Sequence, residues 1–177
     1  MDAWIEPPRR MPLIFGPALW IVRRRTGRDV LLARLLTWYP RAAVGSGVME
    51  SLIAKSVGRV DERMLKLVRM TVSFTVECPF CMGFNSEGWE LLMNDDELAV
   101  VQGRLAVDAV ASLSPAERVA IEYARCGSAT PIAYPAGFDA ILGQHFDQRE
   151  LVVLATTVAQ VNYWARVAQG LGTPSLA

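Results

Sequence analysis

Two cysteines separated by two residues are the strongest chemical feature of this sequence. Cys78 and Cys81 stand in the string Glu-Cys-Pro-Phe-Cys, with a proline directly after the first thiol. Proline suits the first position of a helix, because its missing N–H would have no helical partner there. We therefore expect Cys78 to be the N-cap residue of a helix and Cys81 to lie in its first turn. At that spacing the two thiols can form a disulfide.

The expected position at a helix N-terminus affects the acidity of both thiols. Exposed amides and the helix dipole favour a thiolate by about 0.3–2 kcal/mol, which lowers a thiol pKa from roughly 8.5 to about 7–8. Shielding by Phe80 and Met82 and the charge of Glu77 oppose ionisation. We expect a modestly activated thiol, and helix geometry favours Cys78 as the more exposed one. Glu77 is the only carboxylate adjacent to the pair, so it is the candidate base.

Three interpretations of the pair stay open: redox chemistry, inert packing and metal binding. The chain has three cysteines, and Cys126 stands alone near a predicted helix end. No second pair completes a four-cysteine zinc site, so the pattern favours redox chemistry over metal binding. Free cysteines often simply pack in a core, which is the inert alternative. We expect neither a metal nor a cofactor.

The bulk composition indicates one compact globular domain. The chain has 177 residues, 52% of them hydrophobic, and 18 basic residues balance 18 acidic ones. Without a basic excess we expect no nucleic-acid partner. Three cysteines and no recognisable signal peptide favour a reducing cytoplasm. The apolar stretch from Met11 to Val22 falls short of a membrane span, so we expect it to dock on its own domain or on a neighbouring subunit rather than on a membrane.

Helix signals recur along the chain, whereas period-2 alternation does not, so we predict an all-α bundle without a sheet. Ser114 to Glu117 has a capping serine, a proline and a glutamate in capping-box order. The segments that begin at Asn94 and Asp147 repeat this logic, and Asp61 is expected to cap a central apolar helix. The predicted helices span residues 13–25, 29–38, 41–57, 61–76, 79–93, 95–102, 105–111, 115–126, 135–143 and 148–169.

Several motifs, in this order and spacing, resemble the carboxymuconolactone decarboxylase and alkylhydroperoxidase D-like family over roughly residues 31–172. They are Trp38-Tyr39-Pro40, Val60 to Arg69, Glu77 to Ser86, Leu113 to Arg118 and Val158 to Arg166. The resemblance implies a helical domain over residues 29–177, after an N-terminal extension over 1–28. It also implies a homo-oligomer: a dimer, trimer or hexamer.

The resemblance also implies an activity. In the peroxidase branch the second cysteine attacks the peroxide and the first resolves the product as a disulfide, which gives these roles to Cys81 and Cys78. That branch has a histidine where this chain has Asn85 and a glutamate where it has Lys66. Without that proton relay we expect a weak thiol-dependent peroxidase or a thiol–disulfide oxidoreductase, which acts on a hydroperoxide or small disulfide and is restored by a dithiol protein.

Two other function classes remain as alternatives. One is a helical assembly or ligand-binding module with an idle cysteine pair, and the other is a cofactor-free enzyme for a small ring substrate. The predicted site is Cys78, Cys81, Asn85 and Glu77.

Other polar and aromatic residues have mainly structural interpretations. Glu62, Lys66 and Arg69 form a stripe that is typical of a solvated helix face, with Lys66 beside the thiols as the lesser alternative. Asn85 is expected either to bond the sulfur or to cap local backbone. Asn162 and Arg166, one turn apart on the last helix, are expected to form a structural hydrogen-bond pair, with a site for a polar ligand as the lesser alternative. His145 is expected to be a surface or packing residue. Four aromatic residues are expected in the core or in a subunit interface: Trp38, Tyr39, Trp89 and Trp164.

Overall fold

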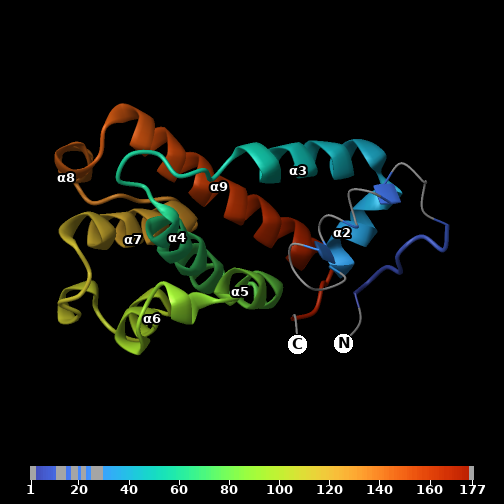
Figure 1. Ribbon diagram of the computed structural model, residues 1–177, viewed down its shortest axis with the longest axis horizontal. Helices are drawn as coiled ribbons and strands as arrows, with labels where there is room; N and C mark the ends of the chain where they lie inside the picture. Colours follow the sequence, from blue (N-terminus) through green and yellow to red (C-terminus); the bar gives the residue numbers. More distant parts are fainter. Residues whose placement is uncertain (1–2, 11–14, 17–19, 21–22, 25–29, 176–177) are drawn as a thin grey trace.

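The computed structural model describes residues 3–10, 15–16, 20, 23–24 and 30–175. Within these residues the chain forms helices joined by loops, and the one β-type contact is an isolated bridge between Val57 and Val60. The predicted all-α architecture is confirmed (Figure 1). The helix expected at 13–25 lies largely outside the described residues, and the boundary between an extension and a domain at residue 28 stays a prediction.

The helices of the described part are α2 (Leu31–Leu35), α3 (Pro40–Leu52), α4 (Glu62–Thr75), α5 (Pro79–Ser86), α6 (Asp95–Val101), α7 (Pro115–Ser128), α8 (Phe138–His145) and α9 (Gln148–Gly170). Short 3-10 turns add η2 (Leu36–Trp38), η3 (Trp89–Leu91) and η4 (Val107–Ala109).

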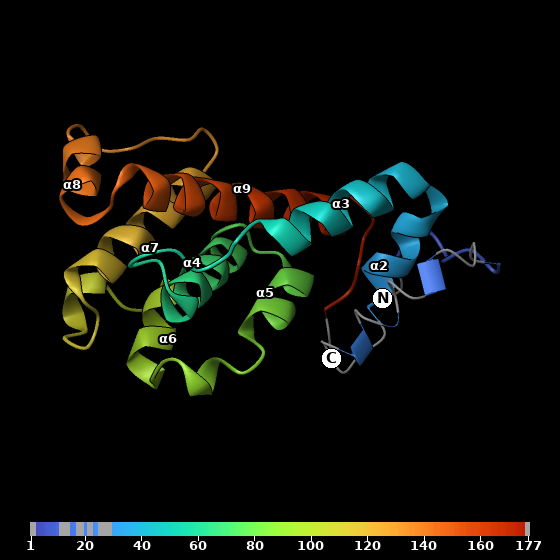
Figure 2. The same ribbon diagram turned by 45° about the horizontal axis from the view of Figure 1, so that its top comes forward.

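Helix α4 is the centre of the molecule, as its apolar sequence predicts. It packs against α7 and α9 on one side and against α5 and α6 on the other (Figures 1 and 2). Its contacts with α7 and α9 form the main core, whose fully or nearly buried members include Val60, Met64, Val68, Val72, Ala120, Leu154 and Val161. Helix α5 follows α4 and packs against α4 and α9.

Side-chain caps fix the starts of α4, α6, α7 and α9, and the caps predicted at Asp61, Asn94, Ser114 and Asp147 are confirmed. The Asp61 carboxylate accepts a hydrogen bond from the Met64 amide at 2.8 Å. Complete capping boxes begin at Asn94, Ser114 and Asp147. These signals are local, so they can be predicted from the sequence.

Replacing Asp147 by alanine is expected to lower the free energy of unfolding by about 0.5–2 kcal/mol, because the Glu150 amide loses its partner at 2.8 Å. Urea denaturation measures the change. Asp147→Asn is the matched control and should stay close to the parent, since asparagine caps equally well. An alanine variant with the parent's midpoint would show that this cap contributes nothing.

Several predicted boundaries were wrong, and backbone turns explain most of them. The single helix expected over 79–93 is two pieces, because Gly88 adopts a left-handed φ of 68° between α5 and η3. The helix expected over 41–57 ends at Leu52, shortly before Ala54 with φ 56°. The helix expected over 105–111 is only the short turn η4, and α8 begins at Phe138 rather than 135, after Gly137 with φ 77°.

A partly buried ion cluster joins α4, α6 and α7. Arg63 on α4 donates to the carboxylates of Glu117 at 2.6 Å and Glu97 at 2.7 Å. The Glu97 side chain is only 3% exposed and also accepts from Ser112 at 2.6 Å. One guanidinium therefore bridges carboxylates from both α6 and α7, and it links these helices to α4.

Candidate functional site

The two cysteines occupy the predicted positions at the start of α5. Cys78 is the N-cap residue, and its sulfur accepts a hydrogen bond from the Cys81 amide at 3.2 Å. Pro79 is the first helical residue, as expected. The two cysteines form a disulfide with their Cα atoms 5.2 Å apart, which is an ordinary separation for this bond. The expected proximity of the thiols is confirmed, whereas their redox activity stays a prediction.

Both sulfur-bearing residues are buried, and the expectation that Cys78 is the exposed one was wrong. Cys78 is 0% exposed and Cys81 is 2% exposed. The cause is an apolar cover that helix geometry alone does not reveal: residues of α2 and of the C-terminal end of α9 pack over the pair. The buried members of this cluster are Val30, Leu32, Phe80, Ala165 and Ala168.

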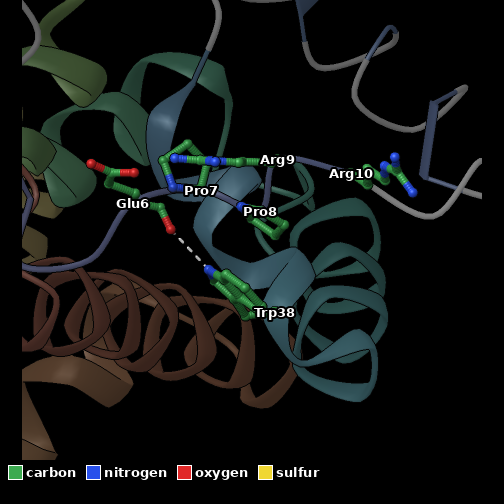
Figure 3. A pocket seen from close by; sticks show the side chains of 6 residues that line it. All are labelled: Glu6, Pro7, Pro8, Arg9, Arg10 and Trp38. Atoms are coloured by element: carbon green, nitrogen blue, oxygen red, sulfur yellow. Dashed lines mark hydrogen bonds between the residues drawn. The ribbon is translucent and has the colours of Figure 1, made fainter.

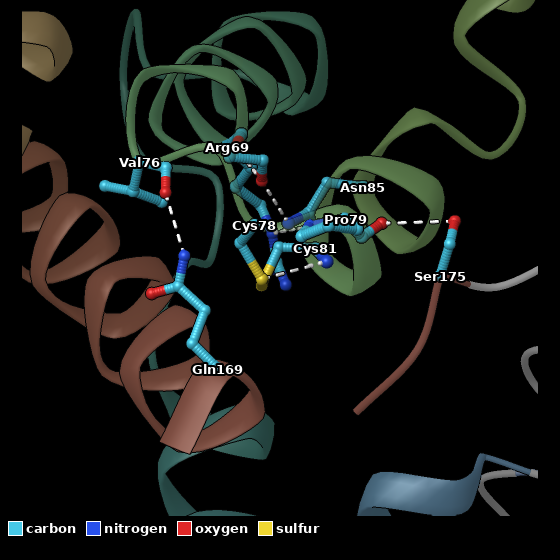
Figure 4. Close-up of a disulfide and its surroundings, with 9 residues drawn as sticks. Arg69, Val76, Cys78, Pro79, Cys81, Asn85, Gln169 and Ser175 are labelled. Carbon is cyan, nitrogen blue, oxygen red and sulfur yellow. Dashed lines mark hydrogen bonds between the residues drawn. A yellow bond between two sulfur atoms is a disulfide. The ribbon is translucent and has the colours of Figure 1, made fainter. Parts of the chain in front are cut away.

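Two hydrogen bonds join α9 and the C-terminal segment to the backbone on either side of Cys78. The Gln169 side chain on α9 donates to the Val76 carbonyl at 2.9 Å, and the Ser175 hydroxyl donates to the Pro79 carbonyl at 3.5 Å. Figure 4 shows Gln169 and Ser175 on opposite sides of the disulfide. A small molecule therefore reaches the sulfurs only when this cover moves.

Asn85, one turn after Cys81, is held by two side chains of α4. Its amide nitrogen donates to the Ser73 hydroxyl at 2.8 Å, and its amide oxygen accepts from Arg69 at 3.1 Å. Figure 4 shows Arg69 and Asn85 in the surroundings of the disulfide. Asn85 is buried, and it bonds side chains rather than the local backbone that was one of its two expected partners.

A carboxylate on α3 completes this polar network, and sequence reasoning missed it. Glu50 forms an ion pair with Arg69 at 3.1 Å. Its second oxygen accepts hydrogen bonds from Gln160 and Trp164 of α9, both at 2.8 Å. Asn162 and Arg166 of α9 do not form the hydrogen-bonded pair that was expected from the sequence. Asn162 donates to the Ser128 hydroxyl and to the Val158 carbonyl, and the side chain of Arg166 is exposed.

Lys66 and Arg69 do not form the solvated stripe that their spacing with Glu62 suggested. Lys66 is half-buried and donates to the carbonyl of Glu87 at the C-cap of α5, the end opposite the cysteines. Burial and the nearby charge of Arg69 lower the pKa of the Lys66 ammonium. Lys66 therefore supports the C-terminal end of α5 rather than the sulfurs.

Glu77 precedes Cys78 with a left-handed φ of 49° and is exposed. Its role as a base stays a prediction. His145 packs edge-on against Phe146, as expected for a packing residue.

A hollow lies apart from the cysteines, where the N-terminal segment meets η2. It is lined by Glu6, Pro7, Pro8, Arg9, Arg10 and Trp38. The Trp38 indole donates to the Glu6 carbonyl at 2.8 Å (Figure 3). Trp38 and Tyr39 are about 60% exposed, so their assignment to the core was wrong, and their place in a subunit interface stays a prediction.

Within the described residues, no group of three or more histidine, cysteine, aspartate or glutamate side chains is placed to hold a metal ion. None of the helices in the described ranges has the length and apolar character needed to cross a bilayer.

Comparisons with known proteins identify the fold. No family model matches the chain. A cysteine-to-alanine variant of the debrominase Bmp8, in complex with 2,3,4-tribromopyrrole, has a TM-score of 0.83 at 16% identity, with 100% of this chain and 94% of that chain covered. A peroxidase-related protein of Ralstonia eutropha, described as an alkylhydroperoxidase AhpD core, has a TM-score of 0.80 at 13% identity, with 99% and 93% covered. The chain thus has the alkylhydroperoxidase D-like fold of the carboxymuconolactone decarboxylases.

The chain is also similar in sequence to one curated protein over nearly its whole length. The uncharacterized protein YnjA of Escherichia coli (strain K12) is 27% identical over 180 residues, which cover 97% of this chain and 93% of that protein. The similarity extends across the cysteine site but assigns it no activity.

Proposed function

We propose that the chain is a thiol-dependent peroxidase or thiol–disulfide oxidoreductase that uses Cys78 and Cys81. The observation that carries the proposal is the disulfide across the first turn of α5, in which the Cys78 sulfur accepts the Cys81 amide N–H. This amide stabilises negative charge on Cys78, so that sulfur is the better leaving group when the disulfide breaks. Fold neighbours described as peroxidase-related support the same chemistry.

In the peroxidase cycle, the Cys81 thiolate attacks one oxygen of the hydroperoxide and the O–O bond breaks. The released alkoxide takes a proton and leaves as an alcohol, while Cys81 becomes a sulfenic acid. Cys78 then attacks the Cys81 sulfur and forms the disulfide, and the hydroxide leaves as water after protonation. A dithiol protein attacks Cys81, displaces Cys78 as a thiolate and receives the disulfide by exchange.

The polar groups near the pair support disulfide exchange better than peroxide reduction. An amide cannot shuttle a proton, and both polar atoms of the Asn85 side chain already have partners. Lys66 lies at the other end of α5. Without a proton relay, protonation of the leaving alkoxide depends on water that enters when the cover opens, so we expect slow peroxide turnover.

Free-thiol counting tests the proposal. The fully reduced chain has three thiols, and one equivalent of alkyl hydroperoxide should leave one, at Cys126. Peptide mapping should then find Cys78 joined to Cys81. A loss of fewer than two thiols per chain would count against the proposal. The same count with a small disulfide and with 2,3,4-tribromopyrrole, the ligand of the Bmp8 structure, distinguishes the substrate classes.

The near-complete burial of both cysteines favours a second candidate, a helical assembly or binding module with an idle pair. In that case Cys78→Ser combined with Cys81→Ser leaves folding and association unchanged, and hydroperoxide removes no thiols from the native protein.

Light scattering measures the mass of the homo-oligomer that both candidates imply. A stripe of exposed residues at one-turn spacing on α3 supports association between copies: Val44, Val48 and Leu52.

A further inference from the structure

We propose that Arg69, held in place by Glu50, supplies a fixed positive charge that stabilises the Cys81 thiolate. The inference rests on the proposed function, because a stabilised thiolate matters only if the pair reacts. It gives this chain a substitute for the histidine–glutamate relay whose positions are taken by Asn85 and Lys66. The substitute acts by charge alone and transfers no proton.

Contacts with α5 place the guanidinium of Arg69 on the helix face that carries Cys81. Cys81 and Asn85 are four residues apart on α5, so their Cβ atoms are about 5–6 Å apart on one helix face. The Nε atom of Arg69 donates to the Asn85 amide oxygen at 3.1 Å. Arg69 therefore lies against the face of α5 that carries Cys81, about one turn from the thiol.

The opposite edge of the guanidinium faces the carboxylate. The Nη2 atom of Arg69 contacts Glu50 at 3.1 Å, while its Nε atom contacts Asn85. The guanidinium thus lies between Glu50 and the Asn85 side chain of α5. Gln160 and Trp164 both donate to the second oxygen of Glu50, which fixes the carboxylate and, through it, the arginine.

Among the described residues, the elements around the pair carry few other charged side chains. Helix α5 contains no charged residue between Pro79 and Ser86. The preceding residue, Glu77, is exposed, Arg34 lies on α2, and Arg166 on α9 is exposed. Arg69 is half-buried, with its side chain 20% exposed, so solvent screens its field less than that of a surface charge.

A permanent cation and a histidine relay give different pH behaviour. Arginine stays protonated across the accessible range, so its effect on the thiol does not titrate. The reactivity of Cys81 should rise with pH through the pKa of its own thiol and reach a plateau above that pKa. Arg69 is a positioning residue, since it acts on Cys81 without touching the substrate.

Thiolate absorbance at 240 nm, followed against pH, tests the inference. The parent for this experiment is Cys78→Ser combined with Cys126→Ser, which leaves Cys81 as the single thiol. Arg69→Met in that background should raise the Cys81 pKa by about one unit, because an opposite charge nearby lowers a thiol pKa by about this amount or more. Arg69→Lys keeps the charge and should recover part of the shift.

Glu50→Gln is the matched variant with the opposite sign. Glutamine keeps an oxygen for Arg69 and removes the negative charge, so the Cys81 pKa should stay level or fall. If the network has only a structural role, Arg69→Met and Glu50→Gln should move the Cys81 pKa in the same direction. An Arg69→Met variant that moves the pKa by less than about 0.3 units overturns the inference, as does a rise in Glu50→Gln.

Arg69→Lys and Glu50→Gln keep the test decisive if Arg69→Met fails to fold. This titration needs no substrate, so its failure and that of the peroxide thiol count are distinguishable.

Discussion

Cys81→Ser is expected to reduce hydroperoxide consumption to the rate without protein. A serine hydroxyl is a far weaker nucleophile than a thiolate, and the structure places no other cysteine close to Cys78. Cys78→Ser should behave differently: Cys81 still attacks, but no thiol resolves the product. That variant should consume about one equivalent of peroxide and then stop, with a sulfenic acid at Cys81 that dimedone traps.

Cys126→Ser is the matched control for both variants, because Cys126 is the free cysteine of the chain. Burial, the largest influence on it, raises the pKa of its thiol, so it should be unreactive near neutral pH. Its replacement should leave peroxide consumption unchanged. Peroxide consumption at the parent rate by Cys81→Ser would contradict the assigned nucleophile, and dimedone labelling of Cys78 in that variant would reverse the two roles.

Arg63→Ala is expected to lower the free energy of unfolding by up to about 3–5 kcal/mol. The substitution leaves the carboxylates of Glu97 and Glu117 without their cation, and these side chains are only 3% and 11% exposed. Removing one partner of a buried ion pair typically costs this much, because the remaining charge stays desolvated. Urea denaturation measures the loss, and Arg41→Ala, at an exposed arginine of α3, should change stability by less than about 0.5 kcal/mol.

The same cluster predicts how stability depends on pH. Burial of Glu97 favours its protonated form, but hydrogen bonds from Arg63 and Ser112 outweigh that effect and lower the pKa of Glu97. A carboxyl whose pKa is lowered by folding stabilises the protein above its unfolded pKa, about 4.3, and this contribution is lost as the pH falls below it. The parent should therefore lose more stability between pH 6 and pH 3 than Arg63→Ala does. Parallel pH curves would contradict this role of the cluster.

The sequence predicted those features that depend on residues close together in the chain. Asp61 and Ser114 were identified as helix caps because a cap bonds the backbone three residues on. The placement of Cys78 and Cys81 on the first turn of α5 followed from Pro79 for the same reason. At Ala54 no residue type indicated the left-handed turn that follows α3. At Gly88 and Gly137 the glycine was the available signal, and the predicted helices ran across it.

The parts of the site that were missed depend on contacts between distant segments. Glu50 is 19 residues from Arg69 and 110 from Gln160, and nothing in its local sequence indicates that α3 lies along α9. The cover over the cysteines has the same origin, since it combines α2 with the end of α9. Periodicity predicts which faces of a helix are apolar, but it does not predict which other helix packs on them.

Redox titration of the native protein tests the central claim most directly. The chain is equilibrated in buffers of reduced and oxidised dithiothreitol under conditions where circular dichroism shows it to be folded, and the disulfide fraction is measured by mass spectrometry. The account predicts one reversible two-electron transition that maps to Cys78 and Cys81, reached from either direction. A pair that is reduced only when denaturant unfolds the chain would show that the thiols are structural and would contradict the account.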